Sequence, residues 1–121
     1  MANWETVWTF RTARFVVTLD VTDEEEDPAG QFENAEDVEF ARAGGWHWFT
    51  ARVRVAFHDS EDPKNWAVTR DRVLGEDYLG GCSYHGLADF KSGGYFRDMV
   101  AQAVEEARGT LARLGTAAAQ L

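Results

Sequence analysis

The sequence predicts one α+β domain over residues 1–121, with an antiparallel sheet of about four to five strands packed on one long C-terminal helix. Two patterns predict this class. Apolar residues alternate with period two through much of the first half, which is typical of strands with one buried face. Near the C-terminus they instead recur every three or four positions, as on one face of a helix. A length of 121 residues with 45% hydrophobic residues suits a single folded domain.

The first two strands are expected to form a hairpin, because residues 11–13 between them are short enough for a tight connection. The stretch from Trp4 to Phe10 alternates and places four residues on one face, namely Trp4, Thr6, Trp8 and Phe10. The stretch from Arg14 to Val21 alternates more cleanly, and its predicted core face consists of Phe15, Val17, Leu19 and Val21.

A strongly acidic loop is expected over residues 20–37. Ten acidic residues and no basic one stand between Asp20 and Glu39, and they account for the formal net charge of −9. Such a block stays solvated and attracts positively charged partners. It serves either solubility alone or a contact with a positively charged partner, which is a protein's nucleic-acid groove or a cation. For the second reading, the expected contact residues are Asp23, Glu24, Glu25, Glu26, Asp27, Glu33, Glu36 and Asp37, together with Trp46 and Trp48.

Gly44-Gly45 predicts a two-residue hairpin turn, because both glycines accept the positive φ that such a turn requires. This turn would pair the residues before it with the start of the next strand, as Phe40 with Phe49, Val38 with Ala51 and Asp37 with Arg52. A short helix from Asn34 to Arg42 is the competing interpretation, since Ala35, Val38 and Ala41 recur at helical spacing.

The next strand is predicted from Trp46 to Phe57, with its odd-numbered residues from His47 to Phe57 facing inward. A further strand over residues 65–74, a turn at residues 75–77 and a short strand over residues 78–84 follow. Gly80-Gly81 is predicted to form a β-bulge in that last strand.

The C-terminal helix is predicted over residues 94–114, with Ser92 as its cap and Gly115 at its end. One turn of a preceding helix is expected over residues 86–91. The apolar stripe of the long helix consists of Phe96, Met99, Val100, Ala103, Val104, Ala107, Leu111 and Leu114.

Catalytic and metal signals are weak, so we predict a non-enzymatic protein without cofactor or metal. Cys82 and His85 stand three residues apart, but a thiol enzyme also needs an orienting group and an oxyanion site. The three histidines lack the spacing of metal ligands. A single cysteine excludes an intrachain disulfide and fits a reducing cytoplasm. No apolar run reaches membrane-helix length, and no signal peptide is apparent.

Trp46 and Trp48 suggest an alternative function, because they share a predicted strand face with Arg52 and Arg54. Aromatic rings beside arginines are typical of single-stranded nucleic-acid platforms. The net charge of −9 opposes direct contact with nucleic acid.

Several segments resemble a family of small phage and mobile-element proteins, most without an assigned function. They are Leu74 to Tyr84 (with Gly75-Glu76-Asp77-Tyr78-Leu79-Gly80-Gly81-Cys82), Phe90, Gly94-Tyr95-Phe96-Arg97-Asp98-Met99-Val100 and Ala107-Arg108. The resemblance brings no catalytic residues with it. It implies an inhibitor of host nucleic-acid machinery, similar to anti-CRISPR proteins, whose partner is a basic host protein or nucleoprotein complex. The sequence is also compatible with a homodimer.

Overall fold

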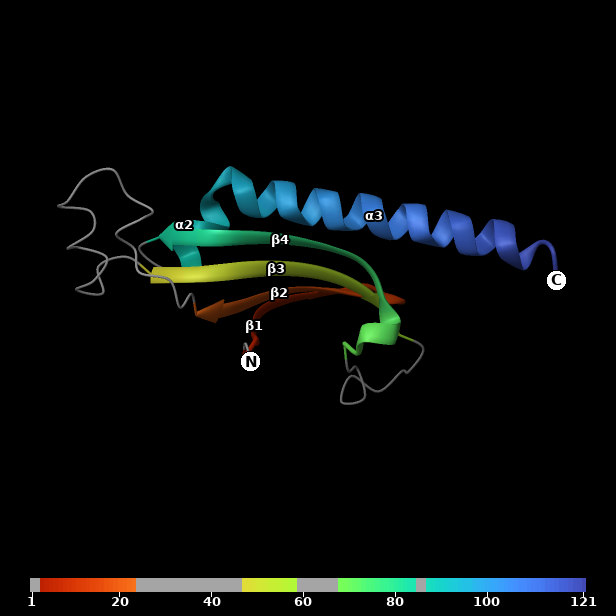
Figure 1. The fold of residues 1–121 in the computed structure, drawn as a ribbon, viewed down its shortest axis with the longest axis horizontal. Coiled ribbons are helices and arrows are strands. Elements are labelled where there is room, and N and C mark those ends of the chain that lie inside the picture. The colour runs from red at the N-terminus through yellow and green to blue at the C-terminus, as the bar shows by residue number, and fades with distance from the viewer. Residues whose placement is uncertain (1–2, 24–46, 59–67, 85–86) are drawn as a thin grey trace.

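The computed structural model describes residues 3–23, 47–58, 68–84 and 87–121. Within them, four strands form one antiparallel sheet in the order β1-β2-β3-β4. The elements are β1 Glu5–Arg11, β2 Phe15–Asp23, β3 His47–Phe57, the 3-10 turn η3 Arg70–Arg72, β4 Val73–Tyr84, α2 Leu87–Ser92 and α3 Gly94–Ala118. Figure 1 shows α3 lying along one face of the sheet. The predicted α+β class, with a sheet packed on a long C-terminal helix, is confirmed.

The central strands β2 and β3 follow the predicted alternation. The side chains that face α3 are buried in one core, which includes Val17, Leu19, Phe49, Ala51, Val53 and Val55. Phe57 is an exception, because 38% of it is exposed. The opposite face of β2 is also buried, at Val16, Thr18 and Asp20. Both faces of β2 therefore carry buried side chains, and the buried polar ones lie on the face away from α3.

A β-bulge changes the course of β1. Its register against β2 shifts between Thr6 and Trp8, so Val7 is an extra residue that reverses the alternation after it. Thr6 faces Asp20 on the side away from α3. Trp8 packs edge-on against Phe96 of α3, with 5.2 Å between ring centroids. The prediction that Trp4, Thr6, Trp8 and Phe10 share one face is therefore wrong.

β4 replaces two predicted elements. Residues 70–72 form η3, and β4 then runs unbroken from Val73 to Tyr84. The predicted strand over residues 65–74 and the predicted turn at residues 75–77 are therefore wrong, although 65–67 themselves lie outside the described residues. Gly75 is a contact residue instead, because a Cβ there would overlap the carbonyl oxygen of Ala103 and lie 2.6 Å from the backbone nitrogen of Ala107. Its lack of a side chain lets α3 approach β4 closely.

The predicted bulge at Gly80-Gly81 is confirmed. Phe49 pairs with Cys82 and Ala51 pairs with Leu79, which leaves two glycines opposite Thr50. Two residues facing one define a bulge, and it increases the local twist of the strand.

The predicted Gly44-Gly45 turn lies outside the described residues, as does the competing helix over residues 34–42. The cross-strand pairs expected from that turn are nevertheless wrong. Phe49, Ala51 and Arg52 each pair with β2 on one side and β4 on the other. A strand residue has two lateral neighbours, so no third strand can pair with these three residues.

The two helices are close to their predicted positions but differ at the ends. α2 matches the expected helical turn over residues 86–91. Ser92 does not cap α3, because its hydroxyl donates to the carbonyl oxygen of Asp89 and Gly93 is the cap residue. α3 also continues past Gly115 to Ala118. One glycine near a helix end lowers helix stability by only about 1 kcal/mol, so it does not have to end the helix.

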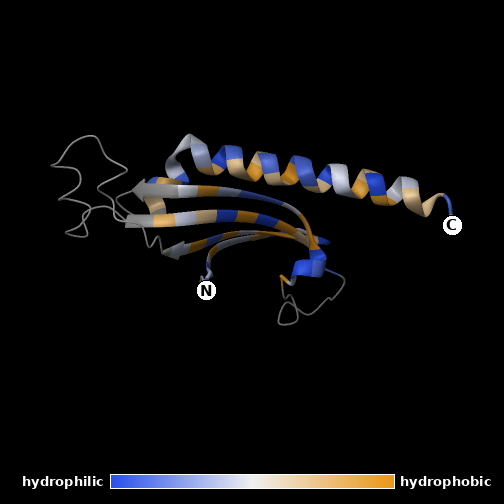
Figure 2. Cartoon of the chain, in the orientation of Figure 1, coloured by the Kyte–Doolittle hydropathy of each residue, from blue (hydrophilic) through white to orange (hydrophobic). Residues whose placement is uncertain are grey.

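The apolar stripe of α3 is only partly buried. Met99, Ala103 and Ala107 are buried against the sheet, whereas Leu111 and Leu114 are 40% and 55% exposed. Figure 1 shows the reason, since the C-terminal end of α3 extends past the end of the sheet. Figure 2 shows hydrophobic residues recurring along this projecting part. Among the described residues, no helix combines the length and the apolar character needed to cross a membrane.

Candidate functional site

The structure describes few of the acidic residues expected to contact a partner. Asp23 is the last residue of β2, paired with Phe49, and Asp20 also lies within β2 rather than in a loop. The other predicted acidic contact residues, and Trp46 with them, lie outside the described residues. They are Glu24, Glu25, Glu26, Asp27, Glu33, Glu36 and Asp37.

The predicted face of Trp48, Arg52 and Arg54 is recognisable in β3. Arg52 and Arg54 alternate with buried odd-numbered residues of β3, so their side chains face away from α3. Trp48 stands at the matching register position in β3. The side chain of Trp48 is outside the described part of the structure. The environment of the two arginines differs from the expectation, because both are mostly buried beside acidic residues of neighbouring strands.

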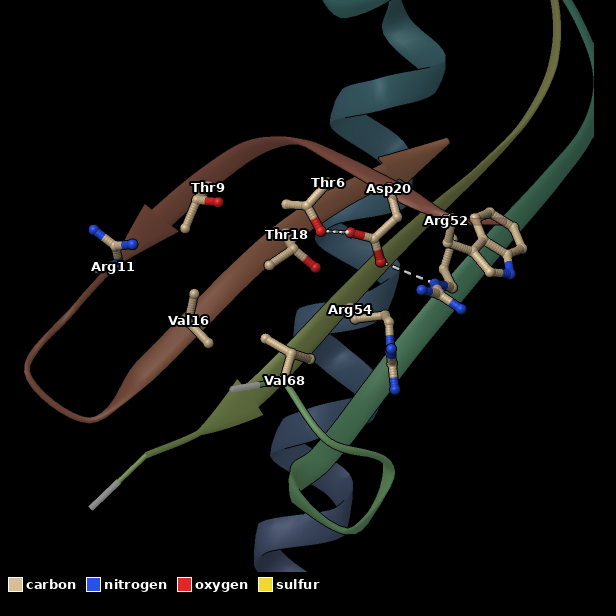
Figure 3. Close-up of a pocket in the computed structure, with 10 residues that line it drawn as sticks. Thr6, Thr9, Arg11, Val16, Thr18, Asp20, Arg52, Arg54 and Val68 are labelled. Atoms are coloured by element: carbon tan, nitrogen blue, oxygen red, sulfur yellow. Dashed lines mark hydrogen bonds and ion pairs between the residues drawn. The ribbon is translucent and has the colours of Figure 1, made fainter. Parts of the chain in front are cut away.

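One row of four residues crosses all four strands on this face, and we call it the Asp20 row. It consists of Thr6, Asp20, Arg52 and Tyr78, which are successive cross-strand partners. The Thr6 hydroxyl donates to Asp20 Oδ1 over 2.6 Å, and Arg52 Nε donates to Asp20 Oδ2 over 2.9 Å. Both carboxylate oxygens therefore have a donor, as Figure 3 shows. Such satisfied buried networks fix the relative position of the strands.

The Trp4 ring contacts two members of the Asp20 row, Arg52 and Tyr78. The Arg52 guanidinium lies 4.1 Å from the centre of the Trp4 ring, a cation–π contact. The same ring meets Tyr78 edge-on, with 6.1 Å between centroids. Arg52 thus has an anion and an aromatic face as partners, which leaves it poorly placed to stack on a nucleobase.

A second row, the Thr18 row, crosses the same strands two residues earlier in β2 and two residues later in β3. It consists of Thr9, Thr18, Arg54 and Glu76, again successive cross-strand partners. Thr18 is 4% exposed. Its Oγ1 and the Nε of Arg54 are buried without a hydrogen-bond partner in the described structure. Arg54 Nε lies 3.8 Å from Glu76 Oε2, an ion-pair distance that is too long for a hydrogen bond.

Two adjoining pockets open on this face and share Arg52 and Arg54. The first has a volume of about 290 Å³ and includes both Asp20 and Thr18 in its lining. The second, of about 340 Å³, extends along β4 at Glu76 and Tyr78 and also includes Glu106 of α3 in its lining. Just before β4, a hydrogen bond from the Thr69 hydroxyl lowers the pKa of the exposed Asp71 carboxyl.

A third, apolar pocket of about 430 Å³ lies on the opposite side of the sheet, next to α3. It is lined mainly by hydrophobic side chains, among them Trp8, Phe15, Val100 and Leu111. Phe10, which also lines it, is 55% exposed. Exposed apolar surface of this kind is typical of proteins that contact other proteins.

The described residues do not test the prediction that the protein is not an enzyme. They include no cluster of three or more His, Cys, Asp or Glu side chains that could hold a metal ion. Cys82 lies in β4 opposite Phe49, and His85 lies outside the described residues, so their predicted lack of catalytic chemistry stays a prediction.

Sequence reasoning identified Arg52 and Arg54 but missed Asp20, Thr18 and Trp4 as their neighbours. Asp20 and Thr18 were visible on the polar face of the second predicted strand. The missing information was the pairing of that strand with β3.

Searches of family models, curated proteins and solved structures find no match to this chain.

Proposed function

We propose that this chain is a non-enzymatic protein-binding module that presents acidic segments to a basic partner. The distribution of charge carries this proposal. The described residues contain ten acids and ten bases, so the sheet and helices have no net charge. The acids are Glu5, Asp20, Asp23, Asp71, Glu76, Asp77, Asp89, Asp98, Glu105 and Glu106, and the bases are Arg11, Arg14, Arg52, Arg54, Arg70, Arg72, Lys91, Arg97, Arg108 and Arg113.

The whole formal charge of −9 therefore belongs to the two segments that join β2 to β3 and β3 to β4. These are residues 24–46 and 59–67. Because the three strands are antiparallel neighbours, the segments are attached at opposite ends of the sheet. A neutral scaffold with acidic connections is suited to electrostatic attraction of a basic surface, which mainly raises the association rate.

The partner class rests on the resemblance to small phage and mobile-element proteins. We propose a basic host protein or nucleoprotein complex in the cytoplasm, whose nucleic-acid channel the acidic segment occupies, as an anti-CRISPR-like inhibitor would. A channel that binds nucleic acid is lined by lysines and arginines, so a dense run of carboxylates complements it.

A capture experiment with matched variants tests this function. The full chain, immobilised, is exposed to host lysate at low and at physiological ionic strength, and bound proteins are identified by mass spectrometry. The test variant carries Glu24→Lys, Glu25→Lys and Glu26→Lys. The control carries Glu105→Lys and Glu106→Lys on the exposed side of α3.

The wild type and the α3 control should capture the same basic protein, and captured material should decrease as salt rises because exposed charges are screened. The acidic-segment variant should lose it while keeping a wild-type melting curve. Equal capture by all three proteins would contradict the proposal and make the acidic segment a solubility feature.

A further inference from the structure

The Thr18 row combines features that the charged segments do not explain. Thr18 and Arg54 face each other directly across β2 and β3. Thr18 Oγ1 and Arg54 Nε are both shielded from water and lack a hydrogen-bond partner among the described residues. Folding removes water from these two groups without replacing the bonds it made. A ligand that supplies an acceptor there would restore those bonds in a shielded environment, where each is stronger than on an open surface.

The two residues that carry these atoms line a pocket, which would bring a ligand next to the row. Thr18 and Arg54 line the space of about 290 Å³ on the face away from α3, beside Thr9 and Val68. Figure 3 shows Thr18 and Arg54 beside the Asp20 contacts, on neighbouring strands. The volume is just below the range of small-molecule sites, which span about 300–1,000 Å³, so it suits a small ligand.

The charge of the lining indicates the sign of the ligand. Three arginines line this pocket, namely Arg11, Arg52 and Arg54, against one acid, Asp20. Asp20 already accepts hydrogen bonds at both oxygens, from Thr6 and Arg52. The remaining polar groups are donors or hydroxyls, which favour an anion over a cation.

We propose that this pocket binds the phosphate group of a small molecule, with phosphate oxygens accepting hydrogen bonds from Arg54 Nε and the Thr18 hydroxyl. A guanidinium matches the geometry of phosphate oxygens, and its hydrogen bonds to an anion are stronger than neutral ones. A phosphate also offers more acceptor oxygens to these donors than a single carboxylate does. This site is independent of the acidic segments and of the protein-binding function.

Thermal melting and NMR titration of the full chain test the site. The probes are inorganic phosphate, glycerol 3-phosphate and, as a carboxylate control, acetate at the same ionic strength. Both phosphates should raise the melting temperature, because a ligand that binds only the folded state stabilises it by mass action. They should also shift the Nε–H resonance of Arg54. Acetate should do neither.

Three variants separate binding from folding. Thr18→Val keeps the shape of the side chain and removes the hydroxyl, and Arg54→Gln removes the charge. Each should weaken phosphate binding at least about 10-fold, as expected for losing a hydrogen bond to a charged group. Arg97→Gln, on the exposed side of α3, should bind as the wild type does.

The responses to the two phosphates identify the source of the group. A stronger response to glycerol 3-phosphate supports a phosphorylated metabolite, and equal responses support the free ion. An unchanged melting curve and NMR spectrum with both probes at millimolar concentration would overturn the proposal. Equal binding by Thr18→Val and wild type would also overturn it, as would an equal effect of acetate. If Arg54→Gln does not fold, Thr18→Val decides the question.

Discussion

The Asp20 row and the Thr18 row cross the same four strands on the same face of the sheet, yet they differ in how well their polar groups are paired. Each has a largely buried arginine in β3, with 14% and 13% of the Arg52 and Arg54 side chains exposed. Arg52 faces a carboxylate at 2.9 Å, and that carboxylate has a second donor in Thr6. Arg54 faces a hydroxyl on one side and a carboxylate at 3.8 Å on the other.

The difference shows how one residue in β2 changes the role of its partner in β3. An aspartate opposite the arginine produces a closed network that holds β1, β2 and β3 together. A threonine at the corresponding place leaves buried donors with unused hydrogen-bonding capacity. Closed polar networks contribute to a unique fold, whereas buried donors without an acceptor lower stability until a water or a ligand supplies one.

The largest expected effect follows from removing the carboxylate of the Asp20 row. Asp20→Ala should lower the free energy of unfolding by about 3–5 kcal/mol, because it leaves the buried Arg52 guanidinium without its anion. Urea unfolding monitored by tryptophan fluorescence measures this. Glu105→Ala, at an exposed position of α3, serves as the control and should change the value by less than about 0.5 kcal/mol. A loss below about 1 kcal/mol for Asp20→Ala would mean that solvent readily replaces the carboxylate.

The two arginines should respond differently to the same substitution. Arg52→Leu leaves the Asp20 carboxylate, which is 4% exposed, without its cation. Arg54→Leu leaves Glu76, whose side chain is 38% exposed and can be hydrated. In phosphate-free buffer, Arg52→Leu should therefore be the more destabilising by at least about 2 kcal/mol. Chemical denaturation of both variants under one condition provides the comparison, and similar losses would show that the rows are not distinct.

The elements that sequence reasoning predicted well are those whose pattern is local. The alternation in β2 and β3 and the helical spacing of α3 each reflect one continuous buried face, so the residues themselves carry the signal. Gly80-Gly81 was also identified, since a pair of glycines within an alternating strand is a local sign of a bulge.

The elements that were missed depend on contacts between distant parts of the chain. The alternation from Trp4 to Phe10 is uninterrupted in the sequence, whereas the bulge at Val7 brings Trp8 to the α3 side of the sheet, where it contacts Phe96. Gly75 was interpreted as part of a turn, but its role is to admit the backbone of α3. A glycine has the same sequence signal in both roles.

The candidate site was predictable only in part for the same reason. Arg52 and Arg54 stood out as basic residues beside aromatic ones, but Arg52 was assigned Asp37 as its partner instead of Asp20. A carboxylate 32 residues away in sequence cannot be identified without the register of the strands. Thr18 Oγ1 and Arg54 Nε lack a hydrogen-bond partner because of how the chain packs, so no sequence pattern indicates it.

The smallest expected effect concerns the Thr18 row, where a substitution should raise the free energy of unfolding instead of lowering it. Thr18→Val replaces an unpaired buried hydroxyl by a methyl group of nearly the same size. Because an unsatisfied buried polar group costs about 1–3 kcal/mol, the substitution should leave stability unchanged or raise it by about 1 kcal/mol in phosphate-free buffer. Equilibrium unfolding with urea measures the change. The equivalent removal of a paired hydroxyl, Thr6→Val, provides the control and should destabilise by about 1 kcal/mol or more, since it takes one donor from the Asp20 carboxylate. If both valine variants lose stability equally, Thr18 has a hydrogen bond in solution, and the contrast between the two rows does not hold there.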